Sequence, residues 1–164
     1  MTAQQHDRFL PVDLSGSRVV VTAAATGIGF TIAEAFLARG ARIAICDINR
    51  DALDSAAKSL PGALVREADV SRADAVADFF AAVDKEMGGV DVLVNNAGLA
   101  LGIGRAPDAD LGDWDTMIAT NCTALAAVCR AALPAMVGRG RGHVVNLGSI
   151  ASTHAYPGGN VYGA

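Results

Sequence analysis

Short, almost wholly apolar runs alternate along this chain with longer stretches in which apolar residues recur every three or four positions. The apolar runs fall at residues 18–22, 42–46, 64–65, 90–94 and 143–147. Nearly continuous apolar strands separated by helices are typical of a parallel sheet that is covered on both faces. The pattern therefore predicts an α/β fold.

The spacing of apolar residues between these runs predicts four helices. In the first, Ile28, Ile32 and Phe36 recur every four residues, and Gly40 provides the stop. Ser71 is a good N-cap for the third, which precedes a pair of glycines. The second, third and fourth helices are expected at residues 50–60, 71–87 and 113–137.

Right-handed crossovers between these elements give a Rossmann-type, doubly wound parallel sheet in three αβα layers, with strand order 3-2-1-4-5. We find no internal repeat or linker, so we expect one domain over residues 15–164 after a flexible tail over residues 1–14. The strand at 143–147 would then lie at an edge. Because apolar edge strands are normally covered or paired, we expect the natural protein to continue beyond residue 164.

Composition narrows the functional classes. The 164 residues are 52% hydrophobic and 5% aromatic, and the net charge is −4 without a basic run, so nucleic acid is not an expected partner. Cys46, Cys122 and Cys129 show no metal-ligand spacing and are expected to be reduced, buried thiols, with no metal site. No apolar run approaches about 18 residues and no leader pattern is present, so we expect a cytoplasmic protein without a membrane partner.

The turn after the first strand is suited to bind a phosphate. Unpaired backbone N–H groups and the positive end of the helix dipole attract an anion, and glycine allows it to come close. The residues expected to bind the cofactor here are Thr22, Ala23, Thr26, Gly27, Ile28 and Gly29. An alanine at position 23 would be tolerated if the backbone φ there is negative.

An acid at the end of the second strand predicts which dinucleotide binds. Asp47 lies twenty residues beyond Gly27, where a carboxylate accepts hydrogen bonds from the adenosine ribose and repels a 2′-phosphate. This favours NAD over NADP, although Arg42 and Arg50 lie nearby in the sequence and can soften the discrimination. Ile48 follows as a further cofactor contact.

Three polar positions later in the chain stand out. Asn121 lies inside an expected helix, where asparagine is unfavourable because its side chain competes for backbone groups. Ser149 follows the fifth strand and Tyr162 comes thirteen residues later, in Asn-Val-Tyr-Gly-Ala. Together with Asn95-Asn96-Ala97-Gly98 after the fourth strand and the glycine loop, this series resembles the short-chain dehydrogenase/reductase family.

The resemblance implies specific roles. Ser149, Tyr162 and Asn121 would be catalytic: tyrosine as acid/base, serine as a partner of the substrate oxygen, and asparagine holding a water on a proton path. Tyr162 would also contact the cofactor, as would Asp69 and Val70 after the third strand, and Asn95, Ala97 and Gly98 after the fourth. The family's Tyr-x-x-x-Lys lysine would fall at position 166, beyond the last residue of this chain, so we expect the 164-residue chain to lack activity by itself.

The resemblance further implies an NAD(P)-dependent oxidoreductase that interconverts a secondary alcohol and a ketone, and a homo-oligomer built through the long fourth helix. The segment 99–164 looks closest to members that oxidise serine and other 3-hydroxy acids. Two alternatives stay open: a catalytically inactive NAD-binding module, and an adenosylmethionine-dependent methyltransferase, which would not account for the Ser149 and Tyr162 pair. Arg105 as a carboxylate ligand and His154 at the substrate mouth are further candidates.

Overall fold

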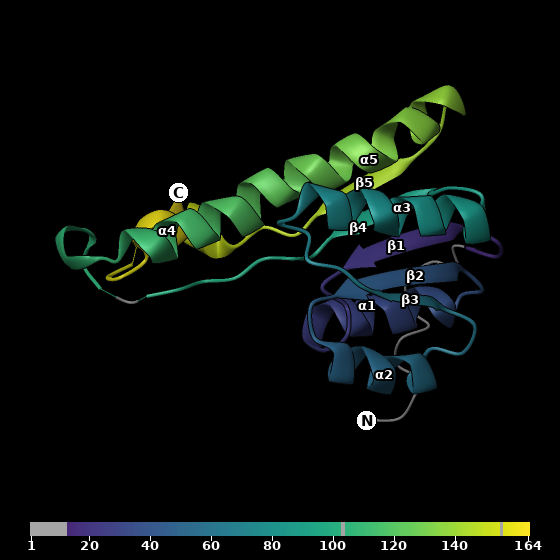
Figure 1. Cartoon of the computed structure of the whole chain (residues 1–164), viewed down its shortest axis with the longest axis horizontal. Coiled ribbons are helices and arrows are strands. Elements are labelled where there is room, and N and C mark those ends of the chain that lie inside the picture. Colours follow the sequence, from purple (N-terminus) through teal and green to yellow (C-terminus); the bar gives the residue numbers. More distant parts are fainter. Residues whose placement is uncertain (1–12, 103, 155) are drawn as a thin grey trace.

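A five-stranded parallel sheet in the order β3-β2-β1-β4-β5 forms the centre of the computed structural model, which describes residues 13–102, 104–154 and 156–164 (Figure 1). This order confirms the predicted fold. The flexible tail predicted for residues 1–14 lies outside the described residues except for its last two positions. The strands are β1 (Arg18–Thr22), β2 (Arg42–Asp47), β3 (Leu64–Glu67), β4 (Val92–Asn95) and β5 (His143–Asn146).

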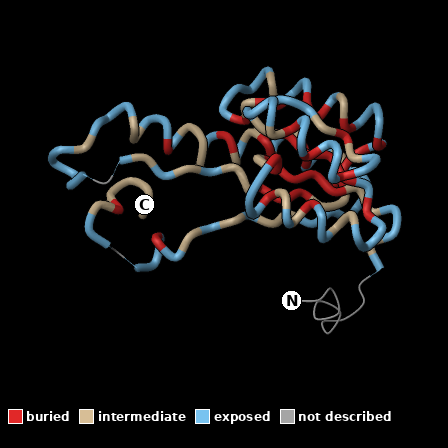
Figure 2. Tube along the Cα trace, turned by 90° about the horizontal axis from the view of Figure 1, so that it is seen from below, coloured by how far each residue is buried: buried red, intermediate tan, exposed pale blue. Residues whose placement is uncertain are grey.

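Helices cover both faces of this sheet. One face carries α1 (Gly27–Leu37) and α2 (Arg50–Ser59), and the other carries α3 (Ala73–Met87) and α5 (Ala124–Gly138) (Figure 1). Because side chains alternate along a strand, Val19 and Val21 pack under α1 and α2 whereas Val20 packs under α3 and α5. Most buried residues accordingly lie in and around the sheet (Figure 2). Short 3₁₀ segments complete the fold: η2 (Ala106–Asp108), η4 (Ile150–Ser152) and η5 (Asn160–Gly163).

The predicted fourth helix is longer and less regular than expected. It begins as α4 (Leu111–Ile118), two residues before the predicted start, because the Asp110 carboxylate caps the Gly112 N–H group. A π-helical turn (Ala119–Thr123) then joins α4 to α5. The α4 end projects beyond the sheet together with the C-terminal segment (Figure 1).

The combined helix Leu111–Gly138 is long and apolar enough to cross a membrane by length and composition, with a mean hydropathy of 1.3 over its most apolar window. The prediction that no such run exists was therefore wrong by this measure. Core helices of globular proteins pass the same test, and α5 packs on α3 and β4.

Three local predictions were also wrong. Helix α3 begins at Ala73 with Arg72 as its N-cap, because Ser71 is instead held by the Asp69 carboxylate through both its N–H and hydroxyl groups. Cys122 is exposed on the outside of the π-turn, whereas Cys46 is buried and Cys129 is half-buried. Ile28 is 68% exposed although the spacing had grouped it with Ile32 and Phe36, since it lies on the first turn of α1, outside the core.

The end of the sheet opposite the expected site is fixed by an ion pair. The Arg18 guanidinium donates to both carboxylate oxygens of Asp91, at 2.8 and 2.6 Å, and the Arg18 N–H adds a third bond. These bonds lower the pKa of Asp91 to about 2. Arg42 lies at the same end, where its guanidinium donates to the Met87 and Glu86 carbonyls.

Candidate cofactor and active site

The N-terminus of α1 is open to an anion. Thr26, Gly27 and Ile28 are exposed there, no side chain caps the helix, and its first turn contains no acid. The first turns of α2, α3 and α4 each carry an aspartate. Because the first N–H groups of a helix lack intrahelical partners, α1 presents a positive helix end that no charge of its own neutralises.

The turn that leads into α1 has a left-handed residue. Ala23 has a φ of +49°, the only non-glycine residue with positive φ in the described part of the chain. The condition under which alanine would be tolerated here, a negative φ, is therefore not met. The physical reason is that its carbonyl is turned to accept a 2.8 Å hydrogen bond from the Asn96 side chain. The first position of this loop thus needs the conformation that favours glycine.

Gly29 is required by close packing. A Cβ built on this residue would lie 2.5 Å from the Asn96 amide nitrogen and 2.6 Å from the Ala23 carbonyl oxygen. Gly27 differs, because its φ is +59° but a Cβ there would meet no atom within 4 Å. One glycine therefore serves packing, and the other serves backbone conformation.

Asp47 ends β2 beside this loop. One carboxylate oxygen accepts from the Ala25 N–H at 3.1 Å and the other from the Asn49 N–H at 3.0 Å. The carboxylate is thereby fixed between the phosphate loop and the start of α2. The next side chain, Ile48, is 69% exposed at the same edge. An ionised carboxylate has further lone pairs and can also accept from two hydroxyl groups.

Asp69 and Val70 follow β3. The Asp69 carboxylate bonds Ser71, as described above, and Val70 is 8% exposed and belongs to the core under α3. The structure therefore assigns both side chains a local structural function, and a cofactor contact at this position stays a prediction.

The segment after β4 ties the glycine loop to the centre of the sheet. The buried Thr22 hydroxyl accepts from the Asn96 and Ala97 N–H groups, at 3.1 and 3.0 Å. The Asn96 amide donates to the Thr22 and Ala23 carbonyls. Asn96 was absent from the predicted site residues, yet it holds both sides of this junction. The signal was the pair of adjacent asparagines, whose side chains must leave a strand end in opposite directions.

Asn95 points the other way, into the interior. Its amide donates 2.9 Å to the Asn146 side chain at the end of β5 and 3.2 Å to the Cys129 sulfur on α5. The side-chain oxygen Oδ1 of Asn95 is buried without a protein partner. The side chain thus joins β4, β5 and α5. The sequence did not predict Asn146 and Cys129 as partners of Asn95, because nothing local marks a partner on another strand or helix.

Asn121 lies within the π-helical turn. Its carbonyl oxygen accepts from the Leu99 N–H at 2.9 Å, and its amide donates to the Leu99 carbonyl at 2.8 Å. This reciprocal pair clamps the long helix to the segment that follows Gly98. A π-turn widens the helix where such a side chain must leave it, and π-turns frequently occur at functional sites.

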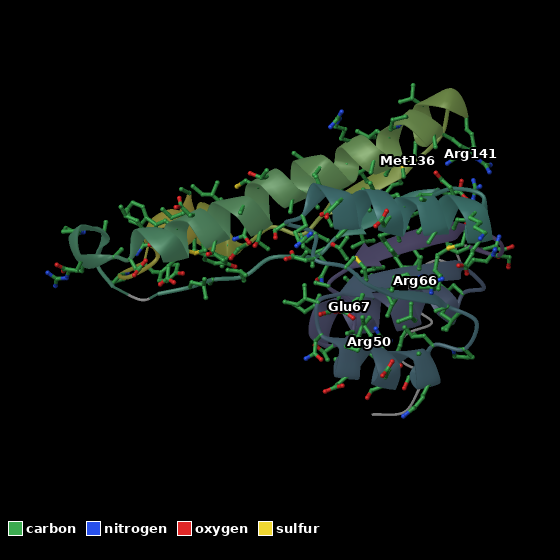
Figure 3. All side chains as sticks on the ribbon, in the orientation of Figure 1. Arg50, Arg66, Glu67, Met136 and Arg141 are labelled. Atoms are coloured by element: carbon green, nitrogen blue, oxygen red, sulfur yellow. The ribbon has the colours of Figure 1, made fainter. Side chains whose placement is uncertain are left out.

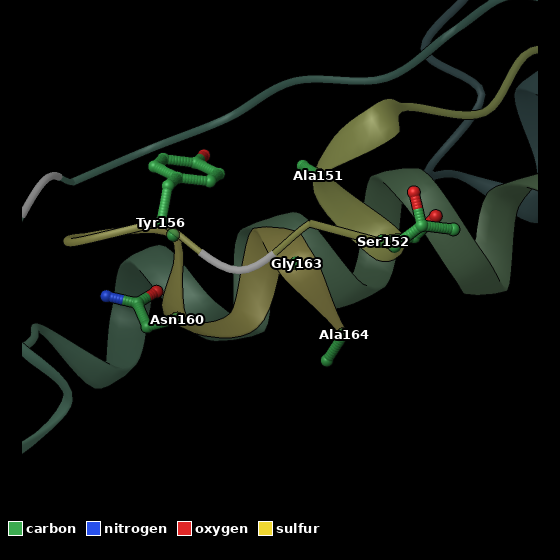
Figure 4. A pocket seen from close by; sticks show the side chains of 8 residues that line it. Ala151, Ser152, Tyr156, Asn160, Gly163 and Ala164 are labelled. Atoms are coloured by element: carbon green, nitrogen blue, oxygen red, sulfur yellow. The ribbon is translucent and has the colours of Figure 1, made fainter.

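Ser149 and Tyr162 come from the two segments after β5. Ser149 is half-buried and caps η4, since its hydroxyl oxygen accepts from the Ala151 N–H at 3.2 Å. Tyr162 is half-buried in η5, and η4 and η5 contact each other. A cavity of about 430 Å³ lies between these segments, lined by Ala151, Ser152, Thr153, Tyr156, Gly159, Asn160, Gly163 and Ala164 (Figure 4). Neither predicted catalytic side chain lines this cavity.

The two softer candidates are on the surface. Arg105 is exposed before η2, and His154 is exposed with its ring nitrogen 2.9 Å from the Thr153 hydroxyl. The structure brings neither into the cluster at the sheet edge. No group of metal-binding side chains occurs among residues 13–102, 104–154 and 156–164.

A family model, described as short chain dehydrogenase, matches residues 17–164. The chain belongs to this family. The predicted resemblance to the short-chain dehydrogenase/reductase family is thus confirmed. Named dehydrogenases and solved dehydrogenase structures are also similar to this chain.

This short-chain dehydrogenase chain is 42% identical over 147 residues to the NADP-dependent 3-hydroxy acid dehydrogenase YdfG of Salmonella typhi, covering 89% of the chain and 59% of that relative. A serine dehydrogenase structure complexed with NADP+ matches at a TM-score of 0.85 and 39% identity, covering 89% of the chain and 59% of that structure. The structure of an NAD+-bound xylitol dehydrogenase matches at a TM-score of 0.86 and 30% sequence identity, covering 92% of the chain and 59% of that structure. The chain therefore spans 59% of the length of each of these proteins.

The residues present in this short-chain dehydrogenase fit a dinucleotide. The acid-free helix end suits a diphosphate, and the absence of a Cβ at Gly29 lets the loop lie directly against Asn96, the residue after β4. Asp47 lies one strand away, as a ribose ligand requires. The exposed Ile28 and Ile48 provide apolar surface at the same edge.

Proposed function

We propose that this short-chain dehydrogenase is an NAD-dependent oxidoreductase that interconverts a secondary alcohol and a ketone, with 3-hydroxy acids as its substrate class. The observation that carries the proposal is the junction at the edge of β1, β2 and β4. There the open end of α1 and the fixed carboxylate of Asp47 flank one loop. The names of the relatives, which include 3-hydroxy acid and serine dehydrogenases, support the substrate class.

A nicotinamide cofactor held at this site would supply the hydride chemistry, by which the carbinol carbon of the substrate would lose a hydride in oxidation and regain one in reduction. The substrate oxygen must lose or gain a proton in the same reaction, and we assign this transfer to the phenol of Tyr162. The Ser149 hydroxyl already accepts a bond from the Ala151 N–H, which leaves its own proton free to donate to the substrate oxygen. Ser149 thus orients the oxygen that Tyr162 deprotonates.

Asn121 acts on this site through the backbone. Its two bonds to Leu99 fix the segment that leaves β4 on the substrate side of the predicted site. Both polar ends of the side chain take part in this clamp, so a water on a proton path would bind a backbone group of the π-turn, or the remaining N–H or lone pair of the Asn121 amide.

The preference for NAD rests on Asp47. A 2′-phosphate placed at this carboxylate would bring a second negative charge against it, whereas two ribose hydroxyls can donate to it. Relatives with either cofactor exist, since one is named NADP-dependent and another is NAD+-bound. The negative charge of Asp47 is therefore the feature whose effect on cofactor preference has to be tested.

Titration calorimetry with NAD+ and NADP+ tests the cofactor preference. We expect tighter binding of NAD+ by about tenfold or more, and a smaller ratio in Asp47→Asn, which removes the charge but retains the shape. Asp51→Asn removes an exposed charge from the first turn of α2 and serves as the control. Equal or tighter NADP+ binding by the unsubstituted protein would overturn the preference.

Reduction of NAD+ over a panel of serine, other 3-hydroxy acids, polyols and secondary alcohols tests the reaction. Turnover by the natural protein should be lost in Tyr162→Phe and reduced in Ser149→Ala. Turnover that survives Tyr162→Phe would refute its acid/base role. Binding of NAD+ without turnover of any substrate would support the alternative of an inactive cofactor-binding module.

We also propose self-association through the outer face of α4 and α5. Leu111, Ile118, Leu133 and Val137 are 40–75% exposed there, an unusual density of large apolar side chains for one helix surface. Sedimentation velocity should show a dimer or larger assembly, and the double substitution Ile118→Lys with Val137→Lys should shift it towards the monomer. A monomeric unsubstituted protein would contradict this proposal.

A further inference from the structure

Two carboxylates lie together where the cofactor's adenosine is proposed to bind. Asp47 and Glu67 end β2 and β3, and they are register partners in the parallel pair. Register partners on neighbouring strands, which are about 4.8 Å apart, project to the same face of the sheet. Glu67 is therefore the nearest acidic neighbour of Asp47 across the strands.

Arg50 forms an exposed ion pair with the second of these acids. It is the first residue of α2, and its guanidinium donates to the Glu67 carboxylate at 3.2 Å (Figure 3). The turn that carries it is well fixed, because the Asn49 N–H bonds Asp47 and the Asn49 side chain caps α2 at Ala52. The backbone of Arg50 is thus held beside Asp47 while its side chain is turned towards Glu67.

The two other arginines on these strands, Arg42 and Arg66, cannot take the same role. Arg42 begins β2, and its guanidinium bonds two carbonyls at the opposite end of the sheet. Arg66 precedes Glu67 on β3 but pairs with Glu86 of α3, on the other face. Of these three arginines, Arg50 is therefore the one available to a ligand at Asp47, and its guanidinium is paired with Glu67.

We propose that Glu67 is a specificity-determining residue for the cofactor, because it holds Arg50 away from the 2′ position of the adenosine ribose. This inference rests on the proposed function, in which that ribose lies at Asp47. Without the Glu67 carboxylate, Arg50 is free to pair with a 2′-phosphate, which accepts two parallel hydrogen bonds from a guanidinium.

The present ion pair is weak enough for this exchange. The two side chains are 72% and 50% exposed, and solvent screens such pairs strongly. A 2′-phosphate at Asp47 would nevertheless have to displace Glu67 from Arg50 and would meet a second negative charge. Removal of that charge should tighten binding of a 2′-phosphorylated ligand by about fivefold to tenfold, the range expected for one partly screened charge pair.

Calorimetric titration of Glu67→Gln with NAD+, NADP+, 5′-AMP and adenosine 2′,5′-bisphosphate tests the inference. The last two ligands differ only by the 2′-phosphate, so they isolate the adenosine end of the site. We expect tighter binding of NADP+ and of the bisphosphate by about fivefold to tenfold, and a change of less than about twofold for NAD+ and 5′-AMP. The gain should shrink at high salt.

A double substitution separates the release of Arg50 from the simple loss of a charge. In Arg50→Gln with Glu67→Gln the gain should disappear, whereas Arg50→Gln alone should weaken NADP+ binding, because it leaves the Glu67 charge unpaired. Glu86→Gln is the matched control, because Glu86 is 46% exposed and also pairs with an arginine of β3. This control should leave unchanged both the ratio of NADP+ to NAD+ affinity and the ratio of bisphosphate to 5′-AMP affinity.

The outcomes are distinct. A gain that persists in the double variant, or no gain in Glu67→Gln while 5′-AMP still binds, would overturn this inference and leave the proposed function standing. An equal gain in Glu86→Gln would show a general effect of net charge and would also overturn it. A failure of the unsubstituted chain to bind either NAD+ or 5′-AMP would overturn the proposed function itself.

Discussion

Replacing Ala23 with glycine should stabilise this protein, although glycine normally destabilises a folded backbone. A left-handed φ of +49° places the alanine Cβ too close to the backbone, at a cost of about 1–2 kcal/mol. Glycine removes that cost but loses about 0.5–1 kcal/mol through the greater freedom of the unfolded chain. The net expectation for Ala23→Gly is therefore a gain of about 0.5–1 kcal/mol in the free energy of unfolding.

Ala24→Gly is the matched control one residue away. Ala24 is fully buried and does not have a positive φ, so the same substitution there loses a buried methyl group, about 0.8 kcal/mol, besides the chain entropy. We expect Ala24→Gly to lower the free energy of unfolding by about 1.5 kcal/mol. The two variants should thus differ in sign and by about 2 kcal/mol, well outside the error of a denaturant titration.

Urea unfolding followed by far-UV circular dichroism measures this difference, and thermal unfolding should move by about 2 °C upwards for Ala23→Gly and about 4 °C downwards for Ala24→Gly. A loss of stability in Ala23→Gly equal to that in Ala24→Gly would refute the reasoning. It would mean that residue 23 has an ordinary negative φ in solution and that its carbonyl does not face Asn96.

Three further predictions concern the same loop and the opposite end of the sheet. Asn96→Ala removes two hydrogen bonds to backbone carbonyls and should cost about 2 kcal/mol in urea unfolding, together with a loss of NAD+ affinity in calorimetry; unchanged affinity would contradict its supporting role. Gly29→Ala, whose Cβ would lie 2.6 Å from a backbone oxygen, should cost more than Gly27→Ala, where only about 1–2 kcal/mol of φ strain arises; the reverse order in unfolding would contradict the packing argument. The pKa of Asp91, lowered from 3.8 to about 2 by Arg18, means that its stabilisation is complete above about pH 4 and is lost as the pH falls towards 2. The free energy of unfolding should therefore fall less steeply with decreasing pH in Asp91→Asn than in the unsubstituted protein across this window. Identical pH profiles of the two proteins would contradict the lowered pKa of Asp91.

The sequence alone determined the fold class, the strand order and the family. Nearly continuous apolar strands and right-handed crossovers left few arrangements, and the glycine loop, the asparagine segment and the Ser149–Tyr162 spacing occur in one order along the chain. These are local or sequential properties, so a single sequence carries them. The sequence also determined the place of Asp47 at the end of β2, since the position of a residue at a strand end follows from the fold.

The tertiary structure alone decided what each side chain contacts. The left-handed Ala23 follows from a carbonyl that turns towards Asn96, more than seventy residues away in the chain, and no local pattern encodes that partner. For the same reason the sequence could not show that Asn95 faces the interior, or that Glu67 occupies Arg50. Hydrogen bonds and ion pairs between strand ends depend on register and side-chain direction, and these are fixed only when the sheet is assembled.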